Sequence, residues 1–345
     1  ACVFASVCVR SPTARQYSTR LALIGIATLR GYSMGAIKEN QFYKAKCSQK
    51  LHEKLGVTPQ SLSRDIELLK DWMSKQPHFP NYAHLNLDTW LENQILIAKN
   101  SLERAKLNID QYFTVRTIAP ELFENRDILN AGIKQSFDNI TLSYLPGLTS
   151  KLLKVAILRI ENTEAEMFHL DHHIKRCLMA MEYFLKAGFD FAGFHVVLDL
   201  QNFRLNHLAR CNVSTLRAMS LAMKAYPVSF TAINIINAPS FVEKAMAMFK
   251  PFISAKLYNR LRVLKDLQEL QELIGDIPLP SDYSGTGISQ RDNSEMMKKE
   301  FLEIRDYIAK CDKTGTVESK RLNKSSHCSS FEPVMNGSFR KLCID

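Results

Sequence analysis

The sequence is poor in glycine, and its glycines do not form nucleotide-binding loops. Only 13 glycines occur in 345 residues. The chain contains neither the G-x-G-x-x-G fingerprint of dinucleotide sites nor a P-loop. The G-x-S-x-G turn of serine hydrolases and the H-E-x-x-H helix of zinc proteases are also missing. The common nucleotide-dependent and hydrolytic enzyme classes are therefore not indicated.

Long apolar runs and patterned cysteines are missing as well. The longest uncharged apolar run, LALIGIATL, covers residues 21–29, whereas a membrane-spanning helix needs about 20 residues. The eight cysteines include no C-x-x-C motif and no zinc-type pairing with histidine. Scattered cysteines of this kind are typical of a reduced cytosolic protein, so we expect a soluble, cytoplasmic chain.

Positive charge is concentrated at the two ends of the sequence. The formal net charge is +10, of which residues 1–38 contribute +5 and residues 312–345 contribute +2. The remaining +3 on residues 39–311 is an ordinary balance. No aromatic-basic platform or recognised nucleic-acid module accompanies this charge, so we predict that nucleic acid is not a partner.

The first 33 residues allow two interpretations. They contain four arginines, no acidic residue and many Ser, Thr and Ala residues, a composition that resembles a mitochondrial transit peptide. The alternative, which we favour, is that translation begins at Met34 and that residues 1–33 are absent from the mature protein. Residues 1–57 are accordingly assigned to a leader and N-terminal extension.

The rest of the chain shows two different patterns. Residues 58–118 predict an all-helical domain, with Thr58 as the first N-cap and Pro59 in the first turn. From about residue 150, the β-branched runs KLLKVAILRI, FHVVLDL and TAINIIN alternate with longer helical stretches. This alternation predicts an α/β fold with a largely parallel sheet covered by helices. Residues 312–345 are Ser- and Lys-rich, and we expect them to be a disordered tail.

Two features of the sequence are candidates for a catalytic or metal-binding role. In HLDHH, His169, His172 and His173 lie at helical spacing, and residues 171–173 resemble the DHH motif of metal-dependent phosphoesterases. A polar first helical turn explains these histidines more simply, so we predict no metal site. Asp199 is a strand-end acid without an obvious partner, for which a structural role is favoured over a role as a base.

Residues 233–257 carry more large apolar side chains than helix packing requires. An apolar strand ends at Asn237-Ala238-Pro239, and the following helix already has a complete apolar stripe. Further apolar residues, including Met246 and Phe249, widen that stripe. Either this helix is buried on nearly all sides, or part of its surface contacts an apolar molecule that is not protein.

These segments resemble the CRAL-TRIO lipid-binding family, especially its α-tocopherol transfer and cellular retinaldehyde-binding group and their insect relatives. The resemblance covers roughly residues 58–288 and rests on SLERAKLNIDQYFTVRTIAPELF, GFHVVLDLQNF, AYPVSFTAINIINAPSFVEKAMAMFKPFISAKLYNRL and LPSDYSG. It implies a helical N-terminal domain at 58–118 and an α/β lipid-binding cage at 119–290, with a charged helix and tail at 291–345. It also implies that the helix at 240–253 is a movable lid.

The resemblance further implies a set of ligand-binding residues. The lining of the family's pocket falls on the central strand, on the helix before the next strand, on that strand and on the lid. A buried Tyr226 hydroxyl or His173 is expected to supply the one polar contact to the ligand. The predicted set is His173, Phe194, Val196, Leu221, Ala222, Tyr226, Ile233, Ile235, Phe241, Met246 and Phe249.

The basic cluster that tocopherol transfer proteins use for phosphoinositides is only half present. Lys256 and Arg260 match one pair of that cluster, whereas the other pair falls on Ser229 and Thr231. We therefore expect weak phosphoinositide selectivity, with general attraction to anionic lipid through Lys250, Lys256 and Arg260. LPSDYSG also differs from the family's L-P-x-x-Y-G-G at Ser284, which suggests a slightly altered turn.

The resulting hypothesis is a carrier that is not an enzyme and has no cofactor. We expect a monomer that transfers one hydrophobic molecule, such as a retinoid, carotenoid, tocopherol or other terpenoid. Transfer would occur through transient peripheral contact with membranes or by delivery to a protein acceptor. The first alternative is a lipid-sensing regulatory or adaptor protein. The second is a metal-dependent phosphohydrolase built on residues 171–173.

Overall fold

The computed structural model describes residues 34–322. The predictions for residues 1–33 and for residues 323–345 of the tail lie outside this range. The chain divides into two units, residues 1–50 and 51–345. Helix α2 (Met34–Leu55) begins in the first unit and ends in the second, and every other described element belongs to the second.

Three helices form the N-terminal part of the second unit. They are α3 (Pro59–Ser74), α4 (Leu87–Ile97) and α5 (Leu102–Ile118), followed by the short helix η1 (Pro120–Leu122). Thr58 is the N-cap of α3, as predicted, and its side chain accepts a hydrogen bond from the Ser61 backbone N–H at 3.1 Å. These helices bury an aromatic core in which the rings of Trp90, Tyr112 and Phe113 lie against one another.

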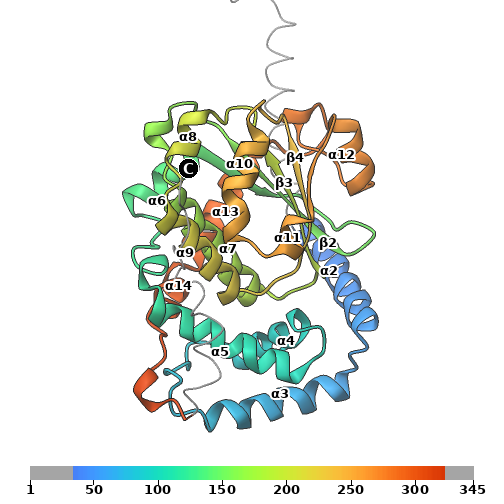
Figure 1. Cartoon of the computed structure of the whole chain (residues 1–345). Helices are drawn as coiled ribbons and strands as arrows, with labels where there is room; N and C mark the ends of the chain where they lie inside the picture. The colour runs from blue at the N-terminus through green and yellow to red at the C-terminus, as the bar shows by residue number, and fades with distance from the viewer. Residues whose placement is uncertain (1–33, 323–345) are drawn as a thin grey trace, which may run out of the picture. The chain divides into compact units, whose positions relative to one another are not determined.

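A five-stranded sheet is the centre of the larger, C-terminal part. Its order is β1-β2-β3-β4-β5, and only the β1–β2 pair is antiparallel. Helices surround it in Figure 1, and the predicted α/β fold with a mostly parallel sheet after a helical region is confirmed. The strands are β1 (Ile140–Tyr144), β2 (Leu153–Ile160), β3 (Gly193–Asp199), β4 (Phe230–Ile236) and β5 (Leu261–Val263).

Helices and short 3₁₀ turns connect the strands. The longest is α7, which joins β2 to β3, and its Gly188 C-cap has a φ of +98°, a conformation that favours glycine. The remaining elements are α6 (Ala131–Asn139), η2 (Ala165–Met167), α7 (Leu170–Ala187), α8 (Leu205–Ala209), α9 (Val213–Ala225), α10 (Val242–Phe249), η3 (Lys250–Phe252), α11 (Ala255–Tyr258), α12 (Leu267–Ile274), η4 (Ser281–Tyr283), α13 (Gln290–Glu303), α14 (Arg305–Cys311) and η5 (Glu318–Lys320).

One face of the sheet is covered over the middle of its three inner strands, and we call it the closed face. Alternate residues of the three inner strands point into it, and Ile157 and Val197 have no exposed surface. They pack against Leu270 and Ile274 of α12 and against residues 277–283. The closed face is defined by Val155, Ile157, His195, Val197, Asp199, Asn234 and Ile236.

The prediction of a disordered tail is wrong for residues 312–322. The guanidinium of Arg321 donates to both oxygens of Asp110 in α5, at 2.8 and 3.0 Å, and to Thr114 at 2.8 Å. Asp312 accepts a hydrogen bond from Arg126 at 2.9 Å. The charged composition of this segment therefore reflects ion pairs with α5 and with the loop after η1, a pattern that composition alone does not distinguish from disorder.

The turn in LPSDYSG keeps a left-handed backbone despite its serine. Ser284 has a φ of +59°, a conformation that glycine adopts without strain. The next residue, Gly285, has no space for a side chain, because a Cβ there would lie 2.0 Å from the Leu279 carbonyl oxygen. The substitution thus leaves the turn in place and adds backbone strain at one residue.

Candidate functional site

The opposite face of the sheet is incompletely covered, and we call it the open face. It is defined by the alternate residues Ala156, Leu158, Phe194, Val196, Leu198, Ile233 and Ile235. Val196 and Leu198 in the central strand keep accessible surface, whereas their neighbour Val197 on the closed face keeps none. Leu158 and Ile233 on the adjoining strands are also partly exposed. Apolar side chains at the middle of a sheet, beneath helices, thus do not meet a fully packed layer.

Two apolar clusters lie beside these partly exposed residues. The first, which joins the N-terminal helices to α7 and α9, includes Phe194 and Ala156. The second combines the end of β2 with α8, α9 and α10 and is contacted by Leu158. Val196 packs against the first cluster, and Met219 of α9 contacts both. The partly exposed strip of the open face therefore runs between two packed regions.

The predicted ligand residues fall into two groups: some are buried in the packed core, and others lie in the partly exposed strip of the open face. Phe194 is surrounded by aromatic rings, including Phe191 at 4.9 Å and Phe184 at 5.8 Å between centroids, and it belongs to the packed core. Leu221 and Ala222 of α9 are buried in the same cluster, and Ile235 is buried on the open face. Val196 and Ile233 lie in the strip itself.

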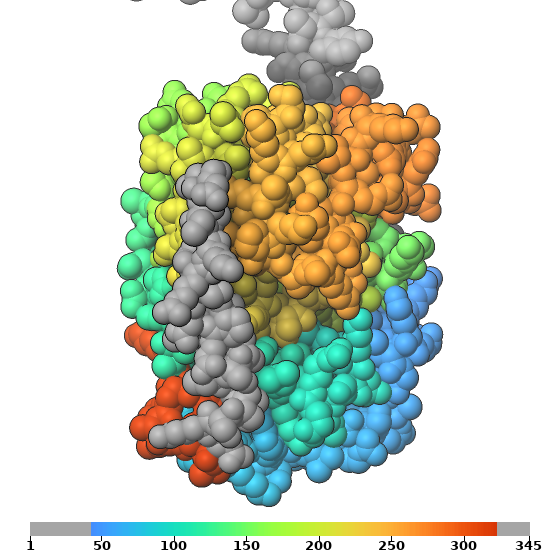
Figure 2. All heavy atoms as spheres, in the orientation of Figure 1, coloured from blue at the N-terminus to red at the C-terminus, as the bar shows by residue number. Residues whose placement is uncertain are grey.

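Helix α10 contains the predicted lid residues and is only lightly buried. Among residues of α10 only Ala245 is buried, while Met246, Met248 and Phe249 are all partly exposed. Phe241, Phe249 and Phe252 pack against the second cluster, and the Phe241 ring lies 5.8 Å from that of Phe203. In Figure 2 the segment from α10 to α12, in orange, is on the visible surface of the molecule. The broad apolar stripe is therefore not explained by burial on all sides.

Asp199 forms hydrogen bonds with the turn that precedes α10 and with Tyr283. These bonds identify the partners of Asp199, which the sequence did not reveal. The buried Asp199 carboxylate accepts a hydrogen bond from the Asn237 side chain at 2.8 Å and from the Tyr283 hydroxyl at 2.8 Å. Asn237 has a φ of +52°, a left-handed conformation that asparagine tolerates. Asp199 thus has a structural role, as expected. Its connection to the N-x-P turn was missed because Asp199 ends β3 whereas Asn237 follows β4, 38 residues later in the sequence.

Tyr226 has its hydroxyl group engaged inside the protein. It donates to Glu182 and accepts a hydrogen bond from Arg116 Nη2 at 2.9 Å. The Tyr112 hydroxyl also donates to Glu182, at 3.0 Å. Burial raises the pKa of Tyr226 far above its usual value. Because its only proton is directed at Glu182, Tyr226 is not free to donate a hydrogen bond to a ligand.

His173, unlike Tyr226, has a buried side chain without a hydrogen-bond partner. Its side chain is 5% exposed, and neither ring nitrogen has a hydrogen-bond partner in the part of the chain that the structure describes. Burial, reinforced by the nearby Arg176 charge, lowers the pKa of His173 well below its usual value. The neutral ring therefore offers one donor and one acceptor. Its centroid lies 5.7 Å from that of Phe168, a member of the second apolar cluster.

The other two histidines of HLDHH, His169 and His172, contact each other near the protein surface, and His172 also contacts Asp171. The rings of His169 and His172 lie 5.2 Å apart, and His172 Nε2 is 3.7 Å from Asp171. Within residues 34–322, no three His, Cys, Asp or Glu side chains gather in a way that would hold a metal ion.

The predicted basic residues are not equivalent. Arg260 is partly buried, and its Nη1 donates to the Phe230 carbonyl oxygen between Ser229 and Thr231. Lys250 is exposed and lies 5.0 Å from the Tyr258 ring centre. Lys256 is exposed. The two lysines are available to an anionic surface, whereas Arg260 supports the start of β4.

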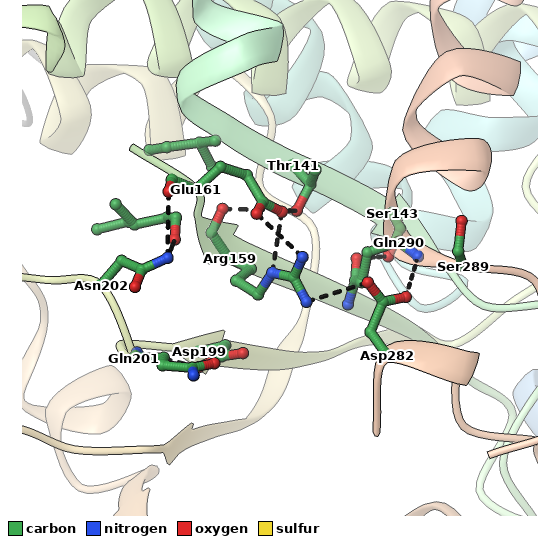
Figure 3. A network of polar contacts seen from close by, with 12 residues as sticks. Thr141, Ser143, Arg159, Glu161, Asp199, Gln201, Asn202, Asp282, Ser289 and Gln290 are labelled. Carbon is green, nitrogen blue, oxygen red and sulfur yellow. Dashed lines mark hydrogen bonds and ion pairs between the residues drawn. The ribbon is translucent and has the colours of Figure 1, made fainter. Parts of the chain in front are cut away.

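A network of polar contacts fixes the edge of the sheet near β1 and β2 (Figure 3). Arg159 forms two hydrogen bonds of 2.9 Å with Glu161 and one of 3.1 Å with Asp282. Asp282 also accepts the Gln290 backbone N–H at 2.7 Å, and Ser143 contacts the Gln290 side chain. These charge-assisted bonds attach the segment that covers the closed face, which makes that side rigid.

No helix among the described residues is long and apolar enough to cross a membrane. Residues 140–285 match the model of the CRAL/TRIO domain, and residues 58–133 match that of the Pinta-like UBA domain. Proteins named "Alpha-tocopherol transfer protein-like" from Pongo abelii, Homo sapiens and Mus musculus are 22% identical over 246 residues, which is 69% of this chain and 69% of each relative. A solved structure titled "Crystal structure of Sfh5" is 12% identical, with a TM-score of 0.43 and coverage of 71% of this chain and 99% of that one.

Proposed function

We propose, from the premise that this chain belongs to the CRAL-TRIO family, that it binds a small hydrophobic molecule and transfers it between membranes. The relatives named as similar to a tocopherol transfer protein support a carrier of lipids in general. The proposed ligand is a retinoid, carotenoid, tocopherol or other terpenoid, and the proposed role is non-enzymatic.

The observation that carries this proposal is the difference between the two faces of one sheet. Val196, Leu198 and Ile233 keep accessible surface at the middle of the open face, although burying a Val, Leu or Ile side chain is worth about 1.5–3 kcal/mol. A folded protein gains nothing in stability by leaving such residues uncovered. An apolar ligand lying on this strip would complete their burial.

Burial of the ligand's apolar surface is sufficient to explain tight binding. Each CH₂ group removed from water contributes about 0.8 kcal/mol, so a terpenoid of about 20 carbons gains more than the roughly 4–15 kcal/mol lost on association. No specific polar interaction is required for tight binding. Polar groups would instead determine how the ligand is oriented.

His173 is the proposed orienting group. It is the predicted polar contact that has no internal partner, in contrast to Tyr226. An unpartnered buried polar group costs about 1–3 kcal/mol. A ligand hydroxyl can pair with whichever ring nitrogen faces it, because it can accept from the N–H or donate to the unprotonated nitrogen, whereas a ligand carbonyl can only accept from the N–H. We therefore favour a ligand with a terminal hydroxyl group.

Helix α10 is the proposed gate. Opening it into water would expose Phe241, Phe249 and Phe252, at a cost of several kcal/mol on the basis of about 1.5–3 kcal/mol for each buried side chain. Contact with a bilayer offsets this cost because the same side chains enter the acyl region. Lys250 and Lys256 would add about 1 kcal/mol each near an anionic surface. Membrane contact would thus trigger exchange.

The proposal is tested by native mass spectrometry of the gently purified full chain, followed by organic extraction of the bound material. We expect one isoprenoid or related apolar molecule per chain. A matched pair of variants locates it: Val196→Phe, in the strip, should reduce occupancy, whereas Val213→Phe, at the exposed start of α9 and outside both apolar clusters, should not. A chain that is purified empty and takes up no apolar ligand would favour the alternative of a regulatory or adaptor protein.

A further inference from the structure

A cavity lies apart from the sheet, where the C-terminal helices meet the loop after η1. Its volume is about 420 Å³, which falls within the roughly 300–1,000 Å³ of small-molecule sites. No strand residue lines it. Its apolar wall consists of Phe123, Ile128, Met179, Phe301 and Ile308, all of them buried.

Arg126 lines this cavity with an unsatisfied donor. The residue is 1% exposed. Its Nε donates to Asp312 at 2.9 Å, and its Nη2 contacts the same oxygen and lies 3.7 Å from Glu182. Its Nη1 has no hydrogen-bond partner among the described residues and almost no accessible surface. Such a buried N–H group needs an acceptor, because a donor removed from water without a partner is destabilising.

The charges around the cavity indicate what kind of acceptor fits. The positive charge of Arg126 is already compensated by Asp312. At the rim, Arg305 and Asp127 pair with each other at 2.8 and 2.9 Å, and the remaining charged lining residues are one acid, Glu124, and one base, Lys313. No net positive charge is left to compensate the desolvation of an anion.

We propose that this cavity binds an uncharged, mainly apolar molecule through a single acceptor oxygen, such as a ketone or ether, which reaches Arg126 Nη1 when the side chains that cover this atom shift. The apolar body lies against Met179, Phe301 and Ile308. This site is additional to the proposed lipid site on the open face, since the two share no lining residue. The ligand would stabilise the contact between the loop at 123–128 and α14, which carries residues 312–322 into the fold.

Photolabelling with benzophenone tests the site directly, because the excited ketone inserts into nearby C–H bonds and Met179 lines the cavity. The full chain is first stripped of lipid, irradiated with increasing benzophenone, digested and mapped by mass spectrometry. We expect saturable labelling of the Met179 peptide. Labelling of peptides that carry Met246 or Met248 reports the open-face site separately, so failure of one site is distinguishable from failure of the other.

Two matched comparisons make the test specific. Ala309 is an exposed lining residue, so Ala309→Trp should fill the mouth and lower Met179 labelling at least about tenfold, whereas Ala309→Ser should leave it unchanged. As competitors, fluorenone should be at least about tenfold more effective than fluorene, which has the same shape without the carbonyl oxygen. Labelling that does not saturate, or that persists in Ala309→Trp, would refute the site. Equal competition by the two probes would refute the role of Arg126.

Discussion

The two faces of the central sheet are made from the same kinds of side chain but differ in how they are covered. On the closed face, Ile157 and Val197 are fully enclosed by α12 and the segment after it. On the open face, Leu158 and Val196 are the next residues along the same strands, yet they remain partly exposed. Since alternation along a strand sends neighbours to opposite sides, this difference arises from the covering layer. One face serves stability, and the other is available for binding.

The largest expected effect contrasts truncations at neighbouring positions of β2. Ile157→Ala on the closed face should lower the unfolding free energy by about 3–4 kcal/mol, because it leaves a cavity in a packed layer. Leu158→Ala on the open face should cost less than about 2 kcal/mol in the lipid-free protein, because part of its surface is already exposed. Urea denaturation measures both. Equal losses at the two positions would mean that the open face is packed like the closed one.

The closed face should also make stability dependent on pH through His195. This residue is 3% exposed and hydrogen-bonded to Asn234 at 2.7 Å. Burial, assisted by the Lys151 charge, lowers the pKa of His195 to about 4. The unfolded chain, with a histidine pKa near 6.5, binds this proton first. Stability is therefore full above pH 6.5 and falls as the pH decreases toward 4, by about 3 kcal/mol for this residue.

Denaturation curves at pH 7 and pH 4.5 of the wild-type chain and of His195→Gln check this dependence. Gln cannot be protonated but can still contact Asn234, so the variant should lose less stability on acidification. An identical pH dependence in both proteins would show that His195 does not contribute. His173, whose pKa is also lowered by burial, acts in the same direction and remains present in both.

The link between the closed face and the gate should control ligand release more than stability. Asn237→Gly keeps the left-handed backbone but removes the hydrogen bond to Asp199. We expect a loss of about 1–2 kcal/mol, typical of a hydrogen bond to a charged group, and release of a loaded fluorescent retinoid about five- to tenfold faster. Ala238→Gly, which leaves that bond intact, is the control. An unchanged release rate in Asn237→Gly would show that the hydrogen bond between Asn237 and Asp199 does not control the opening of α10.

The smallest effect is expected at the turn that follows the closed-face cover. Ser284 has a φ of +59°, a conformation that strains a residue with a Cβ and not glycine. Ser284→Gly should therefore raise the unfolding free energy by about 0.5–1 kcal/mol, reduced in part by the greater entropy of the unfolded glycine. Thermal denaturation detects a shift of this size. A destabilised variant would indicate that the serine side chain makes a compensating contact.

Local sequence patterns were sufficient for the helical domain and the three inner strands, whereas the edge strands β1 and β5 were not predicted. The cap at Thr58, the β-branched runs and the Asn237-Ala238-Pro239 turn each depend on neighbouring residues, and each corresponds to an element of the structure. The open strip was anticipated in part, because the apolar residues of α10 exceed what one packing stripe needs.

Contacts between distant segments could not be predicted in this way. Tyr226 looked suitable as a ligand contact, but Glu182 and Arg116, which engage its hydroxyl, lie 44 and 110 residues away in sequence. Arg321 was placed in a disordered tail, although Asp110 pairs with it from α5. In each case a single polar side chain gives no sign of its partner, and periodicity reports only which side of an element is apolar.

The most direct test is a crystal structure of the full chain loaded with the lipid recovered from it. The account predicts electron density for one molecule along the open face, in contact with Val196 and Ile233, beneath α10 and with a polar end near His173. The closed face should be unchanged. Density that lies elsewhere, or an open face on which α10 packs directly against Val196 with no ligand between them, would contradict the account.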